Sequence, residues 1–200
     1  WGGSKYADGN SVQFSKLGNC ATQSIEIVES RYPVTHLSYE IEPFRGGAGK
    51  HRGGYGSKRV MKVYGKDLVA SSGISRCTMP APGLNGGSHA AVNVLAFKSP
   101  DDPDWRSATD KFGTIAPGLF SNAPLKPDDK IMVITANGAG YGDPFEREPR
   151  AVLADFLDEL LSPEQAKVLF KVVITNGDID ATATSELRQR PEPSDEGVLS

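Results

Sequence analysis

The sequence predicts an α+β fold, in which a mainly antiparallel β-sheet with glycine-rich corners precedes a short C-terminal helical pair. Three observations support this expectation. The 200 residues include 22 glycines and 14 prolines, which favours many tight turns. Short alternating or β-branched runs recur between residues 34 and 135, as in strands. Helical periodicity comes late, after Pro149, a residue tolerated at the first position of a helix.

Four segments predict strands. Residues 37–41 alternate apolar and polar side chains, the pattern of a half-buried strand. Residues 60–64 and 92–97 are rich in β-branched and aromatic types, which favour strands. Residues 131–135 form a continuous, mainly apolar run, so we expect a strand covered on both faces. Three glycine-rich loops separate or follow these runs, at residues 45–56, 80–87 and 137–144.

The segment after residue 145 predicts two short helices. Its first part carries an apolar stripe, with Asp155 on the polar side of the wheel. Ser162-Pro163-Glu164-Gln165 has the pattern of a capping box, which predicts the start of the second helix. Residues 172–175 predict a short return strand. The stripe consists of Val152, Leu153, Phe156, Leu157, Leu160 and Leu161.

Charge and composition divide the chain into three parts. Residues 1–140 carry a net charge of +4 and residues 141–200 a net charge of −7, which indicates two segments with different surroundings. We predict a β-rich module over 1–145, and a helical pair with its return strand over 146–180. Beyond residue 180 apolar side chains become sparse, so we predict a flexible acidic tail over 181–200.

Composition also argues against several functional classes. No run approaches the ~20 apolar residues of a membrane span, and a net charge of −3 argues against nucleic acid as a partner. Two cysteines, Cys20 and Cys77, are too few for a disulfide scaffold and suit a reducing compartment. We therefore expect a cytoplasmic protein with no nucleic-acid or membrane partner. Because the chain begins with Trp1 rather than Met, we expect a fragment, a processed product or a split subunit.

The stretch 45–56 offers the most binding chemistry. It contains six glycines, and from Arg45 through Lys66 there are seven Lys or Arg and no acidic residue. Backbone amides of glycines beside basic side chains suit a phosphate. The spacing nevertheless fits neither a P-loop nor a Gly-x-Gly-x-x-Gly motif. The alternative interpretation is a tight glycine corner between two strands, with its arginines paired to carboxylates elsewhere.

No catalytic or metal-binding arrangement is complete in the sequence. His36, His51 and His89 are scattered and lack the clustering that metal sites require. Cys20 is a candidate nucleophile, although a small buried cysteine is the commoner role for such a residue. The residues alone therefore do not identify an enzyme.

Several motifs occur in an order that is known from one family. The segments are Asn19–Pro33, Tyr39-Glu40 with Gly46–Gly56, Gly83–Gly87, and Leu125–Asp129 with Gly138–Arg147. With these motifs the chain resembles the C-terminal region of the hydantoinase B / acetone carboxylase alpha-subunit family, which includes N-methylhydantoinase, 5-oxoprolinase and ketone carboxylases. Three substitutions depart from the pattern of this family, namely Gln23-Ser24 for Thr-Pro, Cys20 for Thr and Ala136-Asn137 for Pro-Gly, and they bear on the substrate more than on the fold.

The resemblance implies part of an ATP-dependent multisubunit enzyme. Such an enzyme activates a carbonyl or enol oxygen by phosphorylation, either to carboxylate a ketone or to open a cyclic amide of the hydantoin or oxoproline type by hydrolysis. The implied partners are a hydantoinase A-type ATP-binding subunit and the remaining N-terminal part of this subunit. ATP and a divalent metal are implied for the complex, bound outside this chain, so the chain alone is expected to be inactive.

On the same resemblance we predict that Asn19, Arg45, His51 and Arg52 lie nearest to the chemistry. The two arginines would neutralise a phosphate or carboxylate, and Asn19 and His51 would donate hydrogen bonds to an oxyanion. We predict no residue of this chain as a metal or cofactor ligand. The alternative is a non-catalytic scaffold module that assembles the same complex.

Overall fold

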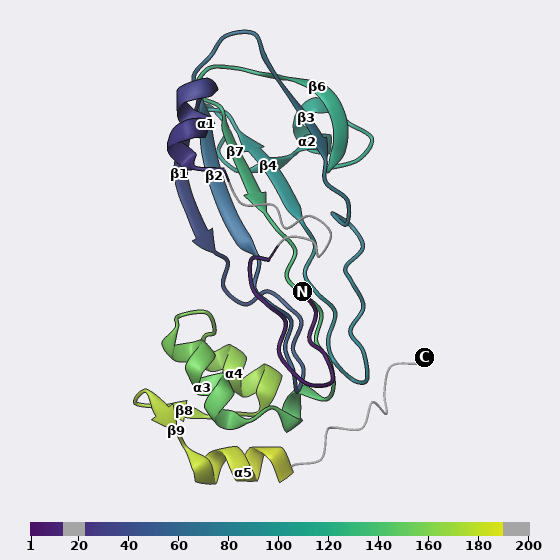
Figure 1. Ribbon diagram of the computed structural model, residues 1–200, viewed down its shortest axis with the longest axis vertical. Coiled ribbons are helices and arrows are strands. Elements are labelled where there is room, and N and C mark those ends of the chain that lie inside the picture. The colour runs from purple at the N-terminus through teal and green to yellow at the C-terminus, as the bar shows by residue number, and fades with distance from the viewer. Residues whose placement is uncertain (14–22, 190–200) are drawn as a thin grey trace.

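The computed structural model describes residues 1–13 and 23–189. The molecule is elongated, with a β-sheet at one end, helices at the other, and extended chain segments running between them (Figure 1). No helix among the described residues is long and apolar enough to cross a membrane.

The main sheet has five strands in the order β1-β2-β7-β4-β5, and every neighbouring pair is antiparallel. This confirms the predicted α+β class and the antiparallel sheet. The apolar strand β7 lies at the centre, where its residues are half-buried or buried except Lys130. The strands are β1 (Val34–Ile41), β2 (Ser57–Val63), β4 (Val94–Lys98), β5 (Arg106–Ser107) and β7 (Lys130–Ile134).

Strand β1 forms where its alternating pattern predicts a strand, but its apolar residues are not buried. Leu37, Tyr39 and Ile41 are 49%, 38% and 47% exposed. The expectation of a half-buried strand is therefore wrong for these side chains. The reason is position: β1 is an edge strand that pairs only with β2.

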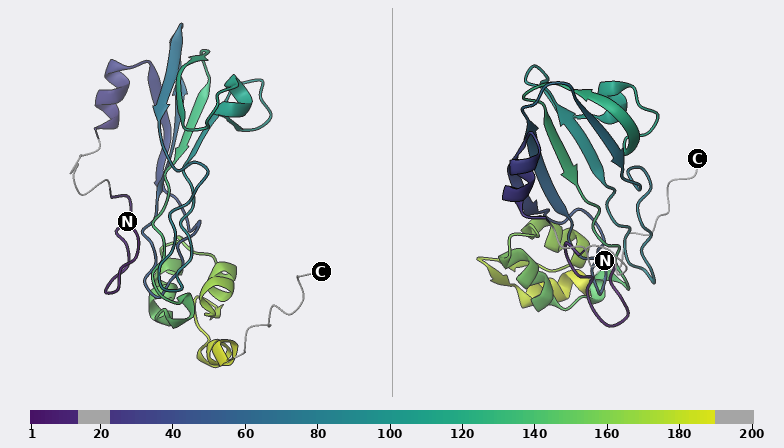
Figure 2. Two further views of the ribbon diagram at one scale, coloured as in Figure 1. Left: turned by 90° about the vertical axis from the view of Figure 1, so that its right-hand side faces the viewer. Right: turned by 45° about the horizontal axis from the view of Figure 1, so that its top comes forward.

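A second, smaller sheet covers one end of the first. Strands β3 (Leu68–Gly73) and β6 (Leu119–Leu125) pair antiparallel. Figure 2 shows α1 (Ile25–Arg31) beside β1 on one side of the main sheet and α2 (Ala108–Phe112) on the other. The core between these elements centres on Phe97, whose ring packs edge-on against two other phenylalanines. Its buried members are Val63, Leu95, Phe97, Ala108 and Leu125.

Below the sheet, extended segments run side by side without forming regular strands (Figure 1). They are joined by backbone hydrogen bonds such as those from Gly9 to Arg52 (2.8 Å), from Gly47 to His89 (2.8 Å) and from Gly138 to Gly54 (2.9 Å). We call this region the glycine bundle. It consists of residues 1–12, 44–56, 81–91 and 136–142.

The C-terminal helices form as the sequence predicts. Helix α3 (Pro149–Leu157) begins at its proline, and α4 (Pro163–Phe170) begins with a complete capping box. In that box the hydroxyl of Ser162 accepts from the Gln165 amide, and the Gln165 side chain accepts from the Ser162 amide. A 3₁₀ turn, η1 (Pro144–Glu146), connects the glycine bundle to α3.

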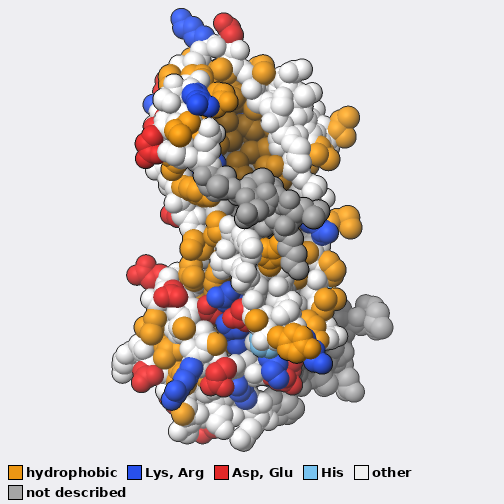
Figure 3. Space-filling model, in the orientation of Figure 1, with side chains coloured by type: hydrophobic (Ala, Val, Ile, Leu, Met, Phe, Trp, Pro, Cys, Tyr) orange, Lys and Arg blue, Asp and Glu red, His pale blue; other side chains and the backbone are white. Residues whose placement is uncertain are grey.

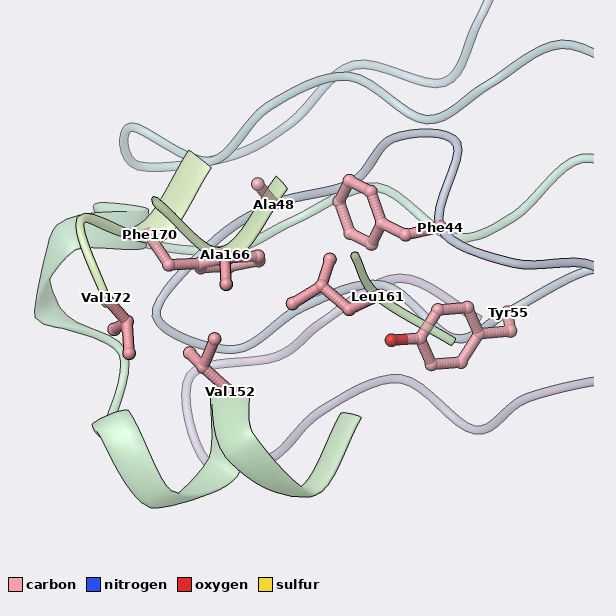
Figure 4. Packing of buried hydrophobic residues seen from close by; sticks show 8 residues of the cluster. All are labelled: Phe44, Ala48, Tyr55, Val152, Leu161, Ala166, Phe170 and Val172. Carbon is pink, nitrogen blue, oxygen red and sulfur yellow. The ribbon is translucent and has the colours of Figure 1, made fainter. Parts of the chain in front are cut away.

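The helices share one core with the glycine bundle. Phe44 and Tyr55 of the bundle point toward α4 and the loop that precedes it (Figure 4). The rings of Phe44 and Phe170 meet edge-on at 5.9 Å between centroids, and the Phe44 amide donates to the carbonyl of Leu160 (2.8 Å). The core therefore crosses the predicted boundary at residue 145. Its members are Phe44, Ala48, Tyr55, Val152, Leu161, Ala166, Phe170 and Val172.

Two expectations about the last part of the chain need correction. The return strand at 172–175 is only the two-residue β8 (Ile174–Thr175), which pairs with β9 (Asp178–Ile179) and not with the main sheet. The predicted flexible tail begins instead with helix α5 (Ala181–Gln189).

Two polar contacts explain why α5 is helical there. Thr184 is buried, and its hydroxyl accepts from the Val173 amide (3.0 Å). The Arg188 guanidinium donates to the carbonyls of Arg147 (2.7 Å) and Phe170 (3.2 Å). These partners are distant in sequence, so the local composition did not reveal them. Residues 190–200 lie outside the described part of the chain.

Candidate functional site

The glycines of the stretch 45–56 allow backbones to approach closely. A Cβ at Gly53 would lie 1.9 Å from the carbonyl oxygen of Gly138, and one at Gly47 would lie 2.0 Å from the same oxygen. Gly47 also has a φ of +80°, a conformation that side-chain-bearing residues adopt at a cost. These glycines are therefore required by chain-to-chain packing.

The backbone amides of the stretch do not form a phosphate cradle. Gly53 donates to the carbonyl of Gly47 (2.9 Å) and Gly54 donates to that of Trp1 (2.8 Å). The amide of His51 donates to Tyr141 (3.0 Å). Because an anion needs amides that have no other acceptor, this part of the chain does not fit the phosphates of ATP.

A buried network of charged side chains lies where the glycine bundle meets α3. Arg52 and Asp155 form a bidentate pair, with Nε to Oδ2 at 2.9 Å and Nη2 to Oδ1 at 2.8 Å. Arg147 donates through Nη2 to Oδ2 of Asp155 (3.0 Å), so this oxygen accepts from both arginines. The side chains of Arg147 and Asp155 are only 3% and 6% exposed.

Asp8 completes the network from the first segment of the bundle. Both terminal nitrogens of Arg147 donate to its carboxylate at 2.7 Å, and the backbone amide of Arg52 donates to it at 2.9 Å. His51 lies at the edge, with Nδ1 3.8 Å from Oδ1 of Asp8. Two guanidinium groups thus face two carboxylates, and the network joins residues 8, 52, 147 and 155.

Burial and charge shift the pKa values of these groups in opposite directions. Burial by itself would raise the pKa of Asp8, but the hydrogen bonds and charges of Arg147 and Arg52 outweigh it and lower that pKa. Burial would lower the pKa of Arg52, yet Asp155 raises it. The pKa of the neighbouring Tyr55 hydroxyl is raised, first by burial and then by the charge of Asp155. The surroundings therefore favour the ionised forms of Asp8 and Arg52.

The three predicted site residues that the structure describes do not form one cluster. Asn19 lies outside the described residues, as does Cys20. His51 and Arg52 reach the charge network, where Arg52 is already paired with Asp155. Arg45 is exposed; its guanidinium lies 3.9 Å from Glu42 and 3.4 Å from the carbonyl of Val92.

Asp8, Arg147 and Asp155 were not singled out as site residues from the sequence. Only Arg147 lies in a motif that carries the family resemblance, and no local pattern shows that its partners are 139 and 8 residues away. Asp155 was instead expected on the exposed side of its helix. That expectation is wrong, because two guanidinium groups accompany the carboxylate into the interior.

Among the described residues, the site offers charge pairing but neither a nucleophile nor a metal site. Both carboxylates are engaged by guanidinium groups, which disfavours a role as general base. Within residues 1–13 and 23–189, no group of three or more His, Cys, Asp or Glu side chains could hold a metal ion. This part of the chain thus fits neither the implied metal nor ATP.

The sequence profile of the Hydantoinase B/oxoprolinase family matches residues 1–144. The chain therefore belongs to this family, as its motifs indicated.

The similar proteins are much longer than this chain. A Pseudomonas sp. (strain NS671) protein, assigned as the B-type subunit of a D-/L-hydantoinase, is 30% identical over 190 residues, 94% of this chain and 31% of that protein. The crystal structure of the ATP-dependent caprolactamase from Pseudomonas jessenii matches 94% of this chain and 32% of its own, with a TM-score of 0.67 and 25% identity. The nucleotide-free structure of acetone carboxylase matches 92% of this chain and 28% of its own, with a TM-score of 0.73. Because its sequence identity is only 22%, this match shows the fold alone.

Proposed function

We propose that the chain is the C-terminal part of a hydantoinase B-type subunit and works in an ATP-dependent multisubunit enzyme. The ATP is held by a hydantoinase A-type partner, and the enzyme activates a carbonyl or enol oxygen by phosphorylation. The observation that carries this proposal is the match of nearly the whole chain to less than a third of family members that include an ATP-dependent caprolactamase.

The substrate we propose is a cyclic amide, which the enzyme opens by hydrolysis. The names of the hydantoinase and caprolactamase relatives support this choice, at 30% and 25% identity. Carboxylation of a ketone is the second candidate, and the fold shared with acetone carboxylase at a TM-score of 0.73 supports it.

Within the complex, we propose that residues 44–56 act chiefly as a scaffold. The pairing of Arg52 with Asp155 and the backbone contacts of Gly53 support this role. It is the alternative to direct contact of Asn19, Arg45, His51 and Arg52 with the reacting oxyanion. Of the two arginines among them, Arg45 is the exposed one. Its guanidinium makes only long contacts, at 3.9 Å from the Glu42 carboxylate and 3.4 Å from the Val92 carbonyl.

ATP hydrolysis by the reconstituted complex tests the proposed activity. The full subunit and its ATP-binding partner should hydrolyse ATP when hydantoin, 5-oxoproline or caprolactam is added. If acetone stimulates ATP hydrolysis instead, and only with bicarbonate present, carboxylation is the function. Turnover of a substrate by the isolated 200-residue chain, without ATP or a partner, would contradict the proposal.

Hydrogen exchange of the complex separates the scaffold from the catalytic role. A scaffold predicts that residues 44–56 become protected when the subunits assemble and that substrate with ATP adds no further protection. Additional protection of this stretch on addition of substrate and ATP would instead support direct contact.

A further inference from the structure

A cavity of about 480 Å³ lies where the main sheet meets the glycine bundle, and none of the four residues of the charge network lines it. Its size is within the usual range of small-molecule pockets, roughly 300–1,000 Å³. Its walls come from β1, β2, β7, the first segment of the bundle and the ends of neighbouring loops. The lining residues that matter here are Tyr39, Arg59, Met61, Val133 and Thr135.

Arg59 is the charged group of this cavity. Its backbone pairs with Tyr39 on β1 and with Val133 on β7, so the three side chains stand side by side on one face of the sheet. The guanidinium carbon lies 4.2 Å from the centre of the Tyr39 ring, a cation–π contact that fixes its position. Within the described part of the chain, no Asp, Glu or Lys lines the cavity.

No carboxylate of the described residues neutralises Arg59. Its guanidinium has no acidic group of these residues within 4.0 Å, in contrast to Arg52 and Arg147. The guanidinium therefore offers a planar fork of donors inside a cavity, which is the geometry that binds a carboxylate in bidentate fashion.

Two other polar side chains of the wall, Thr135 and Asn93, are already engaged. The Thr135 hydroxyl accepts from the Ser57 amide (2.7 Å). The Asn93 amide group accepts from Ala136 (2.6 Å) and donates to Ser75 (2.8 Å). These contacts hold the wall in shape, and they leave Arg59 as the cation that selects the ligand.

We propose that this cavity binds a small organic monocarboxylate, with its carboxylate on Arg59 and its apolar body against Met61 and Val133. Arg59 is the one cationic side chain of the lining among the described residues, which matches one negative charge and suits a phosphate dianion less well. Hydrolysis of a cyclic amide and carboxylation of a ketone both yield a carboxylate. A product of the proposed reaction thus belongs to the ligand class, although binding at Arg59 does not depend on that reaction.

Calorimetric titration of the intact natural protein tests the site directly. The probe is 3-phenylpropionate, and the matched neutral compound is 3-phenylpropan-1-ol. We expect the carboxylate to bind with a dissociation constant of about 1 mM, as for other small ligands, and the alcohol to bind at least tenfold more weakly. Phenyl phosphate, a dianion, should also bind more weakly than the carboxylate.

Three variants assign the binding to Arg59. Arg59→Met should lower the affinity for 3-phenylpropionate at least tenfold, and Arg59→Lys should give an intermediate loss because it keeps the charge without the fork. Lys58→Met is the control: it removes a charge from the adjacent residue of the same strand, whose side chain pairs with Glu40. The control should bind as the unaltered protein does. Thermal melting of each variant checks that it is folded.

Several outcomes would overturn the proposal. They are equal affinity of Arg59→Met and the unaltered protein, equal affinity for acid and alcohol, tighter binding of phenyl phosphate, and no binding at about 10 mM acid. Because the readout is binding and not turnover, a failure here is distinct from a failure of the proposed activity.

Discussion

Asp155 holds the buried charge network together, because its carboxylate faces two guanidinium groups. Replacing it with asparagine keeps the shape but leaves Arg52 and Arg147 without their shared counter-charge. Removing one partner of a buried ion pair costs about 3–5 kcal/mol. We therefore predict that Asp155→Asn lowers the free energy of unfolding by about 3 kcal/mol, measured by urea denaturation.

The matched control for Asp155 is an exposed ion pair. Glu40 pairs with Lys58 at 3.1 Å, and its side chain is 51% exposed. Exposed pairs contribute between about 0 and 1 kcal/mol, so Glu40→Gln should change stability by less than about 0.5 kcal/mol. Equal effects of the two substitutions would show that the network does not stabilise the fold.

Asp8 makes the stability of the protein depend on pH in the acidic range. Its pKa in the folded state lies below the ordinary value, since Arg147 and Arg52 favour the ionised carboxylate over the opposing effect of burial. The stabilisation is therefore complete above the unfolded pKa of about 3.9, and is lost as the pH falls through the folded pKa. The stability difference between the unaltered protein and Asp8→Asn should shrink from about pH 6 to about pH 3. A difference that stays constant over this range would contradict the assignment.

At the scale of elements, the glycine bundle depends on backbone contact. A Cβ at Gly53 would lie 1.9 Å from a carbonyl oxygen of the neighbouring segment, whereas one at Gly73 on β3 would meet nothing within 4 Å. We predict that Gly53→Ala destabilises the protein by about 3 kcal/mol or more, or prevents folding. Gly73→Ala should be neutral or slightly stabilising, because it restricts only the unfolded chain. Thermal unfolding compares the two, and similar melting temperatures would refute this account of the bundle.

The elements that the sequence predicted well depend on neighbours close in the chain. The capping box needs only Ser162 and Gln165, three residues apart, and Pro149 begins α3 through its own ring geometry. The five-stranded arrangement was not predicted in detail, because β2 and β4 meet β7 through contacts that span many residues. Helix starts that depend on neighbouring residues can be predicted from the sequence, whereas the pairing of distant strands cannot.

The same distinction explains the candidate site. The basic, glycine-rich stretch is obvious in the sequence, but whether Arg52 meets a ligand or a carboxylate depends on Asp155, 103 residues away. The helical wheel placed Asp155 toward solvent because it considers only one helix. Arg59 belonged to the same basic stretch, and only the pairing of β1, β2 and β7 places it in a cavity.

At the scale of the whole molecule, one flank exposes more apolar surface than its fold requires. The edge strand β1 and the adjacent α1 expose the side chains of Ile27, Tyr32, Leu37 and Ile41 by 43–56%. Figure 3 also shows an apolar hollow in the half of the molecule that contains the sheet. Contiguous exposed apolar surface and an unpaired strand edge are typical of regions that another chain covers. The chain spans less than a third of its relatives' length, which agrees with the proposed subunit context.

This surface yields a prediction about assembly. In the isolated chain the outer backbone amides of β1, apart from that of His36, which donates to Glu29 (2.6 Å), should exchange with solvent rapidly, because the strand pairs on one side only. In the complete subunit, assembled with its ATP-binding partner, we predict that these amides exchange at least about tenfold more slowly, since covered edge groups open less often. The central strand β7 is the internal control and should be slow in both samples. If the amides of β1 exchange at equal rates in the isolated chain and in the complex, the rest of the assembly does not cover this strand. The flank formed by β1 and α1 would then not be the surface through which the chain contacts the other parts of the complex.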